Sequence, residues 1–413
     1  MRHMRAAALA AFGFIATAGT AYAGCGIDQG SVRILSNDFD ALGIIIDAAK
    51  ECAGDGVTVS ANMTTEHKSL QVPALSVNPA RYTVATIANN SIAPLLTKDL
   101  IRPLDEYVKK WGGELDDRQL IRVDGKVVAI AFMINSQHLF MRKDVLEEAS
   151  IKEPPKTYAE ILAAAKKIRD KGIMKYPLAA TDQAGWYLAT EFVNIYLATG
   201  GDFFKPGSAE PAIDNKDGLE TLKTMKALTQ YMAPNYMSVS ADEMKNMYLS
   251  GNVAIMNQWG SMVEAHTDPK GPAPKIAANT ILDPAPTLKG HDIPASALWW
   301  DGFAIAKNIS DKDAEASFQA MMHALRPQVA EDHPKASVWL AKGFNAPKSA
   351  QGILKTASGG ARPYPMSPYM GLMHTALGNE LSDFMQGNES AEKALKDVSA
   401  AYRTAARETG FLQ

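Results

Sequence analysis

Two adjacent tryptophans, Trp299 and Trp300, stand directly before Asp301 in the stretch SALWWDGFAIAKN. A flat indole face packs well against C–H groups, and a neighbouring carboxylate accepts hydrogen bonds from hydroxyls. Neighbouring residues on an extended strand point to opposite sides, so one indole can meet a ligand while the other packs inside. Asp301 shares a side with Trp299. We therefore expect Trp299 and Asp301 to face a ligand, with Trp300 as the alternative.

Further candidates follow from the rule that ligands of open α/β sheets bind beyond the carboxyl ends of the strands. The loops chosen in this way contain Asp38, then Glu66 and His67, then Asn89 and Asn90, and finally Gln258 and Trp259. Trp186 and Tyr187 are expected to add flat faces from the second half of the chain, and Arg362 lies in a Pro-rich loop that is also a candidate. Aromatic faces flanked by amides and carboxylates suit a neutral sugar or polyol.

Each candidate also has a purely structural interpretation. Asp38, Asn89 and Asn90 could simply cap the helices that follow them, because Asp and Asn are favoured N-cap residues. Trp186 and Tyr187 could pack at the start of a helix, and Trp259 could belong to the core. A cationic ligand such as a polyamine is a second option for Asp38, Glu66 and Asp301 together. An anionic ligand is disfavoured, because Arg is scarce in these loops.

Sequence motifs for catalysis are absent. The chain has no G-x-S-x-G, Walker A, complete G-x-G-x-x-G or H-E-x-x-H sequence, and none of its eight His residues are paired at i, i+4. We therefore expect no catalytic residue, no metal site and no cofactor. A pair of glycosidase carboxylates needs no local motif, so this alternative stays open.

Alternating strand-like and helix-like segments would position these residues. The segments SVRILS, VTVSAN and RYTVATIA are followed by expected helices over 39–52, 66–76 and 91–98. Such alternation indicates an α/β fold with parallel strands and helices on both faces of the sheet. Farther along, Asp124-Gly125 predicts a hairpin turn. Thr157 and Glu160 have the spacing of a capping box, which predicts a helix start.

Length and composition indicate a globular protein of two domains. The 413 residues exceed the size of one ordinary core, and 46% of them are hydrophobic while 21% are charged. The net charge is −3, and it becomes −5 once an N-terminal leader with two Arg is removed. This balance, without a basic cluster, disfavours nucleic acid as a partner.

The N-terminus resembles a secretory leader. A basic start, MRHMR, precedes the apolar run AAALAAFGFIATAG and the small-residue pattern Ala21-Tyr22-Ala23. The apolar run is too short to span a bilayer. We therefore expect residues 1–23 to be a signal peptide and the mature protein to be periplasmic.

Cys25 and Cys52 are the only two cysteines. In an exported chain such a pair indicates a disulfide. The geometry of a βα unit supports it, because the helix end at Cys52 returns to the start of the strand near Cys25. The alternative is a lipidated Cys25. Tyr22 stands where the lipid-acceptor pattern wants an aliphatic residue, and lipidation would leave Cys52 unpaired, so we favour the disulfide.

Four segments in order resemble the sugar-binding family of ABC-importer solute-binding proteins related to maltose-binding protein. They are DGKVVAIAFMINSQHLFMRKDVLEEASIKEPPKTYAEIL, YLSGNVAIMNQWGSM, WWDGFAIAKNISDKDAEASFQAM and FNAPKSA. The family's usual Gly-Gly is replaced here by Trp299-Trp300-Asp301, and its proline after Ala-Ile by Ala306. These departures leave the fold expectation unchanged but do not allow one sugar to be named.

The resemblance implies the periplasmic-binding-protein type II fold, with two lobes, a hinge and a ligand cleft between them. The N-terminal lobe would comprise 24–136 plus 302–347, and the C-terminal lobe 137–301 plus 348–413. The implied function is capture of a small carbohydrate or polyol by hinge closure. The implied partner is the permease of an ABC importer, and the family expectation is a monomer.

Overall fold

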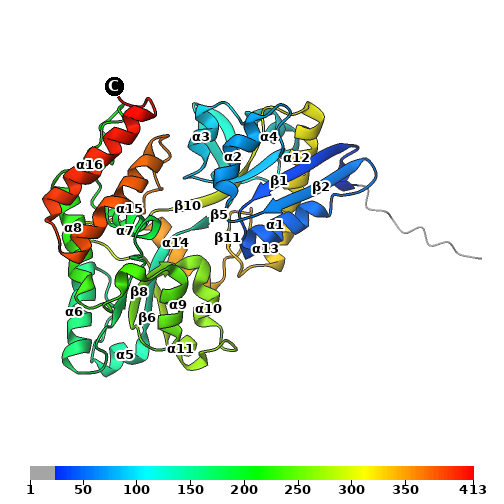
Figure 1. The fold of residues 1–413 in the computed structure, drawn as a ribbon. Coiled ribbons are helices and arrows are strands. Elements are labelled where there is room, and N and C mark those ends of the chain that lie inside the picture. Colours follow the sequence, from blue (N-terminus) through cyan, green and yellow to red (C-terminus); the bar gives the residue numbers. More distant parts are fainter. Residues whose placement is uncertain (1–23) are drawn as a thin grey trace, which may run out of the picture.

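The computed structural model describes residues 24–413, so the expected signal peptide lies outside the described residues. Two lobes are joined by extended segments that run between them (Figure 1). Each lobe has its own sheet, and the first sheet is larger than the second. The α/β type II fold expected from the sequence is therefore present.

The first lobe contains a sheet in the order β11-β5-β10-β3-β1-β2, with β4 paired to β5. Its strands are β1 (Gly30–Ser36), β2 (Val57–Met63), β3 (Val84–Ala88), β4 (Leu120–Val123), β5 (Lys126–Asn135), β10 (Trp299–Ile305) and β11 (Val338–Trp339). The parallel arrangement predicted from the alternation holds for β1, β2 and β3. It fails for β10, which runs antiparallel to both β3 and β5 because no crossover helix precedes it.

Helices cover both faces of this first sheet. They are α1 (Asp40–Lys50), α2 (His67–Ser76), α3 (Ile92–Thr97), α4 (Asp105–Trp111), α12 (Asp311–Ala324) and α13 (Pro327–Asp332). Residues of α1 and α12 pack with Phe303 and Ile305 of β10, while residues of α2 and α3 pack with Trp300 and Ala304. Successive side chains of β10 thus enter two different cores, as the twofold period of a strand requires.

The second lobe has a smaller sheet in the order β7-β8-β6-β9. Its strands are β6 (Gln137–Arg142), β7 (Leu178–Ala179), β8 (Ile255–Trp259) and β9 (Thr280–Asp283). Its helices are α5 (Lys143–Glu148), α6 (Tyr158–Asp170), α7 (Trp186–Ala198), α8 (Lys216–Thr229), α9 (Ala241–Leu249), α10 (Val263–Thr267), α11 (Pro274–Ala278), α14 (Gln351–Ser358), α15 (Met370–Gln386) and α16 (Ala391–Glu408). Helix α7 is buried from Leu188 to Ala198, so it forms the centre of this lobe.

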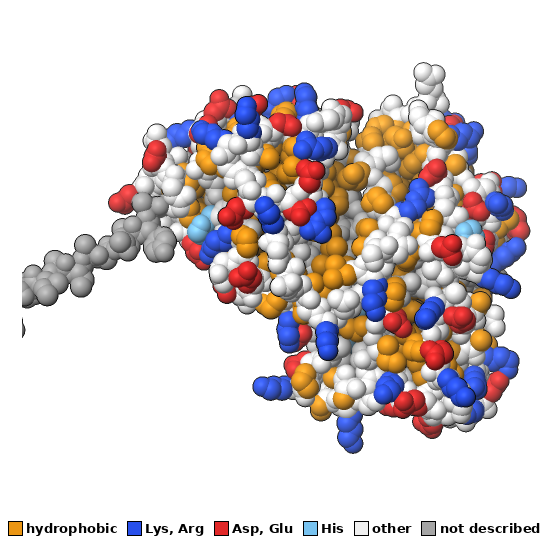
Figure 2. All heavy atoms as spheres, turned by 180° about the vertical axis from the view of Figure 1, so that it is seen from behind, with side chains coloured by type: hydrophobic (Ala, Val, Ile, Leu, Met, Phe, Trp, Pro, Cys, Tyr) orange, Lys and Arg blue, Asp and Glu red, His pale blue; other side chains and the backbone are white. Residues whose placement is uncertain are grey.

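The chain passes between the two sheets at three places. Strand β5 of the first sheet is separated from β6 of the second by Ser136 alone. The chain returns at Trp299, where β10 begins, and leaves again after β11, before α14 packs on β6 and β9. In the space-filling view, hydrophobic atoms gather between the two lobes (Figure 2).

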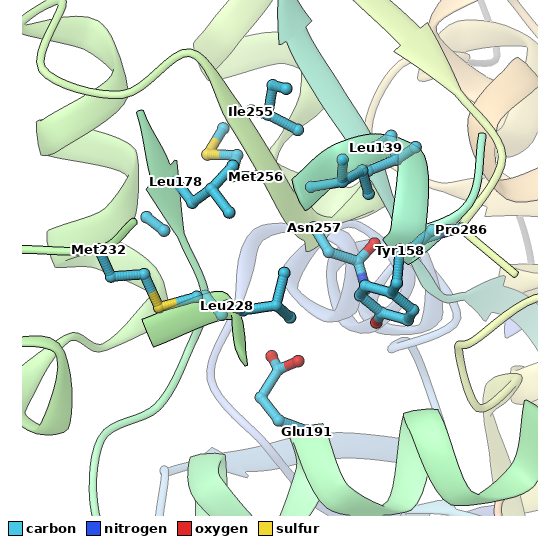
Figure 3. Close-up of a pocket in the computed structure, with 13 residues that line it drawn as sticks. Leu139, Tyr158, Leu178, Glu191, Leu228, Met232, Ile255, Met256, Asn257 and Pro286 are labelled. Atoms are coloured by element: carbon cyan, nitrogen blue, oxygen red, sulfur yellow. The ribbon is translucent and has the colours of Figure 1, made fainter. Parts of the chain in front are cut away.

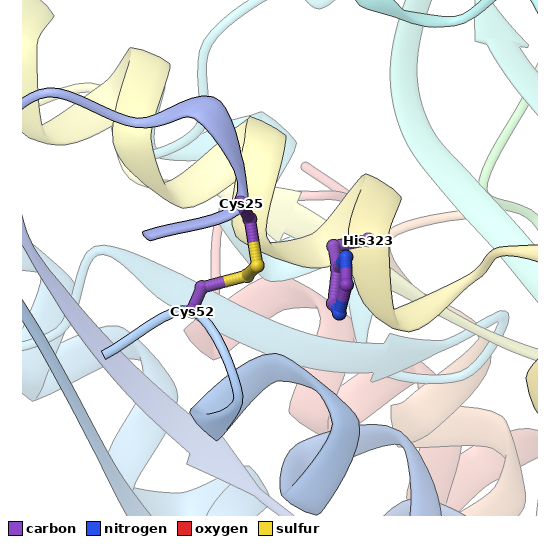
Figure 4. A group of neighbouring side chains, drawn as sticks. All are labelled: Cys25, Cys52 and His323. Atoms are coloured by element: carbon purple, nitrogen blue, oxygen red, sulfur yellow. A yellow bond between two sulfur atoms is a disulfide. The ribbon is translucent and has the colours of Figure 1, made fainter. Parts of the chain in front are cut away.

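Cys25 and Cys52 form the expected disulfide, with their Cα atoms 5.0 Å apart. The bond ties the segment before β1 to the end of α1, as the βα geometry predicts. Closing a 27-residue separation contributes on the order of 3–4 kcal/mol in the chain-entropy model. His323 lies beside the bond (Figure 4), but both sulfur atoms are bonded to each other, so this group is not a metal site.

Within residues 24–413, no helix combines the length and the apolar character needed to cross a bilayer.

Candidate functional site: the interlobe cleft

A cluster of five rings forms the wall of the cleft on the side of the second lobe. We call Trp186, Trp259, Trp299, Tyr364 and His374 the aromatic cluster. Its three indoles lie with ring centroids 5.9–6.3 Å apart, and Trp299 packs against Tyr364 with centroids 4.5 Å apart and ring planes tilted by 30°. Trp186 begins α7, Trp259 ends β8 and Trp299 begins β10, so separate elements supply them. Of the predicted site residues, the structure brings these three tryptophans together.

His374 holds this wall in one arrangement. Its Nε2 lies 3.1 Å from the backbone oxygen of Trp186, and its Nδ1 lies 3.1 Å from the hydroxyl of Tyr364. A carbonyl oxygen only accepts, so we assign the proton to Nε2, and the Tyr364 hydroxyl then donates to Nδ1. Burial lowers the pKa of His374 to about 4, and the charge of Lys68 adds to this effect. The aromatic cluster is therefore uncharged at neutral pH.

Trp299 and Trp300 enter different lobes, as the strand geometry predicts. Trp299 is 7% exposed and packs in the core of the second lobe, whereas Trp300 is 8% exposed and packs in a core of the first lobe. The Nε1 atom of Trp299 is buried and has no hydrogen-bond partner among the described residues. An unpaired buried donor is costly, so this N–H is available to a ligand acceptor.

Polar side chains of the first lobe lie beside the crossing segment that leads to Trp299. Asn89 and Asn90 follow β3, and their side-chain oxygens are both buried without a partner among residues 24–413. The amide nitrogen of Asn89 donates to the backbone oxygen of Leu298, which joins this wall to the crossing segment. Neither residue is the cap of the next helix, because Ser91 occupies the N-cap of α3.

Asp301 and Lys68 are the charged groups of this wall. Asp301 pairs with Ala88 at the end of β3, and Lys68 lies in the first turn of α2. Burial raises the pKa of Asp301 to about 7, and the positive charge of Lys68 acts in the opposite direction. Desolvation lowers the pKa of Lys68, although the residue as a whole is exposed to solvent. The ammonium of Lys68 is thus close enough to Asp301 to act on its carboxyl.

The other predicted residues of the first lobe lie at the ends of β1 and β2. Asp38 is exposed and does not cap α1, because Phe39 is the N-cap residue. Glu66 is the N-cap of α2 without a side-chain cap bond. His67 is buried, and this burial lowers its pKa to about 4. In the second lobe, Tyr187 stands edge-on to Trp186 with ring centroids 5.3 Å apart.

Two predicted residues have their polar groups bonded within the protein. The segment VAIMN was expected to be a strand followed by a loop, but β8 starts two residues later and includes Gln258. Gln258 is fully buried, donates to the backbone oxygen of Ala241, and accepts from the backbone N–H of Trp259. The guanidinium of Arg362 binds Asp202 and the backbone oxygen of Gly201. Both residues therefore have structural partners, which the sequence rule for loops could not reveal.

Two further residues of this site, Lys68 and His374, are not among those predicted from the sequence. Lys68 follows directly after the two residues that the loop rule selected, so a window longer by one residue would have included it. His374 lies in the second turn of the 17-residue helix α15, and no local signal separates it from an ordinary core histidine.

A separate internal cavity lies under the sheet of the second lobe and has a volume of about 30 Å³. Apolar side chains such as Leu139, Leu178 and Met232 form much of its lining, and the carboxyl of Glu191 points toward it (Figure 3). This volume admits one or two water molecules and no sugar. The cavity is therefore not the ligand site.

A hydrogen-bond network beside this cavity ties the crossing segments to the second lobe. Gln137, the first residue of β6, accepts from Asn194 at 3.0 Å and donates to Glu191 at 3.3 Å. Its backbone N–H donates to Ser296, and Asn194 accepts from the backbone N–H of Ala297. The start of β6 and the segment before β10 are thus held to α7, the helix that begins with Trp186.

Comparison with known proteins identifies the family. Residues 46–337 match the model of the bacterial extracellular solute-binding proteins. This match covers more than half of the chain. The protein belongs to this family.

Individual relatives are distant. A maltotriose-binding protein of Pyrococcus abyssi is 26% identical over 192 residues, which are 44% of this chain and 39% of that protein. The maltose-bound structure of MalE3 from T. maritima has a TM-score of 0.77 at 16% identity and covers 91% of this chain and 100% of that one. A ribitol complex of an ABC transporter solute-binding protein from Agrobacterium radiobacter has a TM-score of 0.75 at 18% identity, over 92% and 99% of the two chains. The structural likenesses establish the shared fold.

Proposed function

We propose that this solute-binding protein captures a small neutral carbohydrate or polyol in the interlobe cleft and delivers it to the permease of an ABC importer. The observation that carries the proposal is the pairing of an uncharged ring surface with unpartnered polar atoms on the opposite wall. Sugars and polyols present C–H faces to the first kind of surface and hydroxyls to the second. Family membership and the maltose and ribitol complexes of similar structures support the same class.

The spacing of the rings determines which surface of the aromatic cluster a ligand can contact. A ring held between two aromatic planes needs about 7 Å from plane to plane, because each contact takes about 3.5 Å. The three indoles of the aromatic cluster instead lie against one another. The ligand then contacts the outer surface of the cluster, with Trp186, the most exposed of the three, as one contact.

A polyamine fits this cleft less well than a neutral solute. Asp301 supports a cation, but Lys68 stands beside it and its charge reaches His374 on the opposite wall. A ligand that carries its own positive charge would be repelled by Lys68.

Ligand binding would close the cleft by rotation at the three crossings between the lobes. We further propose that the protein works as a periplasmic monomer without catalytic activity. The extracellular family supports this location, and its description as solute-binding proteins supports binding without chemistry.

A thermal-shift screen tests the proposed class. Sugars, polyols, polyamines and amino acids are added in turn, because a ligand that binds the folded state raises the melting temperature. We expect a shift with at least one neutral saccharide or polyol, confirmed by calorimetric titration. A clear shift with putrescine or spermidine and none with any carbohydrate contradicts the proposal, and turnover of an oligosaccharide contradicts a role in binding alone.

A further inference from the structure

The charged pair on the first-lobe wall carries a further inference about selectivity. Lys68 and Asp301 form no side-chain hydrogen bond and no ion pair within 4.0 Å among the residues that the structure describes, 24–413. Lys68 is exposed and Asp301 is half-buried, so their hydrogen-bonding capacity is not used inside the protein.

The backbone places the two residues at the same edge of the sheet. Gln71, one turn after Lys68 on α2, donates to the backbone oxygen of Thr86 on β3 at 2.8 Å. Thr86 pairs with Phe303 of β10, two residues after Asp301. The first turn of α2 therefore lies over β3, next to the strand that carries Asp301. The positive charge of Lys68 lowers the pKa of both Asp301 and His374, which fits an amino group that faces the cleft.

The chemistry of the two groups is complementary. An ammonium group only donates hydrogen bonds, and an ionised carboxylate only accepts them. A hydroxyl does both, so one ligand hydroxyl can accept from Lys68 and donate to Asp301. A ligand ammonium can only donate and is repelled by Lys68, whereas a ligand carboxylate can only accept and is repelled by Asp301.

We propose that Lys68 and Asp301 together select a neutral hydroxyl, so that Lys68 excludes amino sugars and Asp301 excludes sugar acids. This inference rests on the proposed function and assigns the selectivity of the same cleft to two residues. Rejection by a misplaced charge is a repulsive contribution to specificity, which adds to the attraction of the wall for hydroxyls.

The experiment compares three probes that differ in charge at one end. D-sorbitol is neutral, D-gluconate carries a carboxylate and D-glucamine carries an ammonium; D-glucose, D-glucuronate and 6-amino-6-deoxy-D-glucose provide the ring series, with the change at C6. Dissociation constants are measured at pH 8 by calorimetry with the full mature chain. We expect the neutral probe of at least one series to bind the wild type. The acid and the amine of that same series should then bind at least about tenfold more weakly than the neutral probe.

Two variants should relax this selectivity in opposite directions. In Lys68→Met the penalty against the amine should fall at least about tenfold relative to the neutral probe, while the acid stays excluded. In Asp301→Asn the affinity for the acid should rise relative to the affinity for the neutral probe, while the amine should still bind weakly. Lys98→Met, which removes another exposed lysine of the same lobe, is the matched control and should leave all ratios unchanged.

The outcomes separate this inference from the proposed function. If a neutral probe binds but the wild type binds its acid or amine equally well, or both variants keep the wild-type ratios, the assignment to Lys68 and Asp301 is wrong. If no neutral saccharide or polyol in the earlier screen binds, the proposed function fails and the inference fails with it. Melting curves without ligand show that each variant is folded.

Discussion

The two walls of the cleft are built on different principles. On the side of the second lobe, the rings of the aromatic cluster contact one another and the hydrogen bonds of His374 fix their arrangement. On the side of the first lobe, Asn89 and Asn90 hold buried side-chain oxygens without partners among the described residues. The rings are thus held in place before a ligand arrives, with only the Nε1 atom of Trp299 unpartnered, whereas the oxygens of Asn89 and Asn90 are satisfied only when a donor reaches them.

This difference between the two walls suggests how ligand binding can close the two lobes. The aromatic cluster, which we call the ring wall, offers packing area that depends little on the exact position of the ligand. The polar side chains of the first lobe, which we call the polar wall, form hydrogen bonds only when a ligand donor or acceptor comes within about 3 Å of them. A ligand that rests on the rings is then bonded by the first lobe, which favours the closed state. Substitutions in the two walls should therefore have separable effects.

The largest effect is expected from substitutions of Trp299 and Trp300, where the chain crosses between the lobes. Trp299→Ala should weaken ligand binding by on the order of 2–4 kcal/mol, because buried tryptophans at the centre of an interface contribute most. Trp300→Ala should lower the free energy of unfolding by about 3–5 kcal/mol, since it opens a cavity in the first lobe, and should leave binding by the folded protein largely intact. Trp299→Ala should destabilise the second lobe as well, because Trp299 is equally buried, so the two variants differ in binding. Calorimetric titration and urea unfolding of both variants test this contrast. Loss of binding in a folded Trp300→Ala, with normal binding in Trp299→Ala, would show that we have assigned the wrong face.

The next effect concerns pH and the polar wall. Burial raises the pKa of Asp301 to about 7, and a hydroxyl donor stabilises the ionised form. Binding then favours the ionised state, so affinity should rise with pH by about tenfold between pH 6 and pH 8. Lys68 on α2 acts on Asp301, and His374 on α15 is neutral here because its pKa is about 4.

Titration calorimetry at several pH values measures this dependence. Asp301→Asn should flatten the profile, because it removes the titrating group. A wild-type affinity that is level across this range, or a slope that persists in Asp301→Asn, contradicts the assignment.

A smaller effect is expected at the ring wall. Trp186 is 41% exposed, so Trp186→Ala should cost little folding stability, within about 1 kcal/mol. It should weaken binding by about 1 kcal/mol, or about fivefold, through the loss of one stacking face. Trp186→Phe keeps a ring at this position and should recover much of the loss. Equal binding by all three proteins places the ligand elsewhere on the aromatic cluster.

The smallest effect should appear at Asn90. Its unpartnered oxygen accounts for one hydrogen bond to a ligand, which is about 1 kcal/mol. Asn90→Ala should therefore weaken binding only a few-fold. Asn89→Ala provides the comparison, because Asn89 also bonds Leu298 of the crossing segment, so this variant should lose folding stability as well. If Asn90→Ala is the variant that lowers the melting temperature, the structural role belongs to Asn90 and the assignment to Asn89 is wrong.

Several parts of the architecture could be predicted because their causes are local. The capping box of Thr157 and Glu160 begins α6 as expected, since both partners lie within one turn. Cys25 and Cys52 pair because a strand followed by a helix brings these positions together. Trp299 and Trp300 enter different cores because neighbouring side chains on a strand point to opposite faces. In each case the distance along the chain is short or the repeat is fixed by backbone geometry.

Only the tertiary structure decided which residues share the cleft. Trp186 and His374 are 188 positions apart and yet meet through one hydrogen bond, and no periodic pattern in either helix indicates that contact. Gln258 was expected in a loop, but its strand begins two residues later, because a short apolar run marks a buried segment without marking its ends. The sequence by itself thus determined the elements and the residue types suited to a sugar. The packing of the two lobes decided which of those residues face one another, because contacts between distant segments depend on the whole fold.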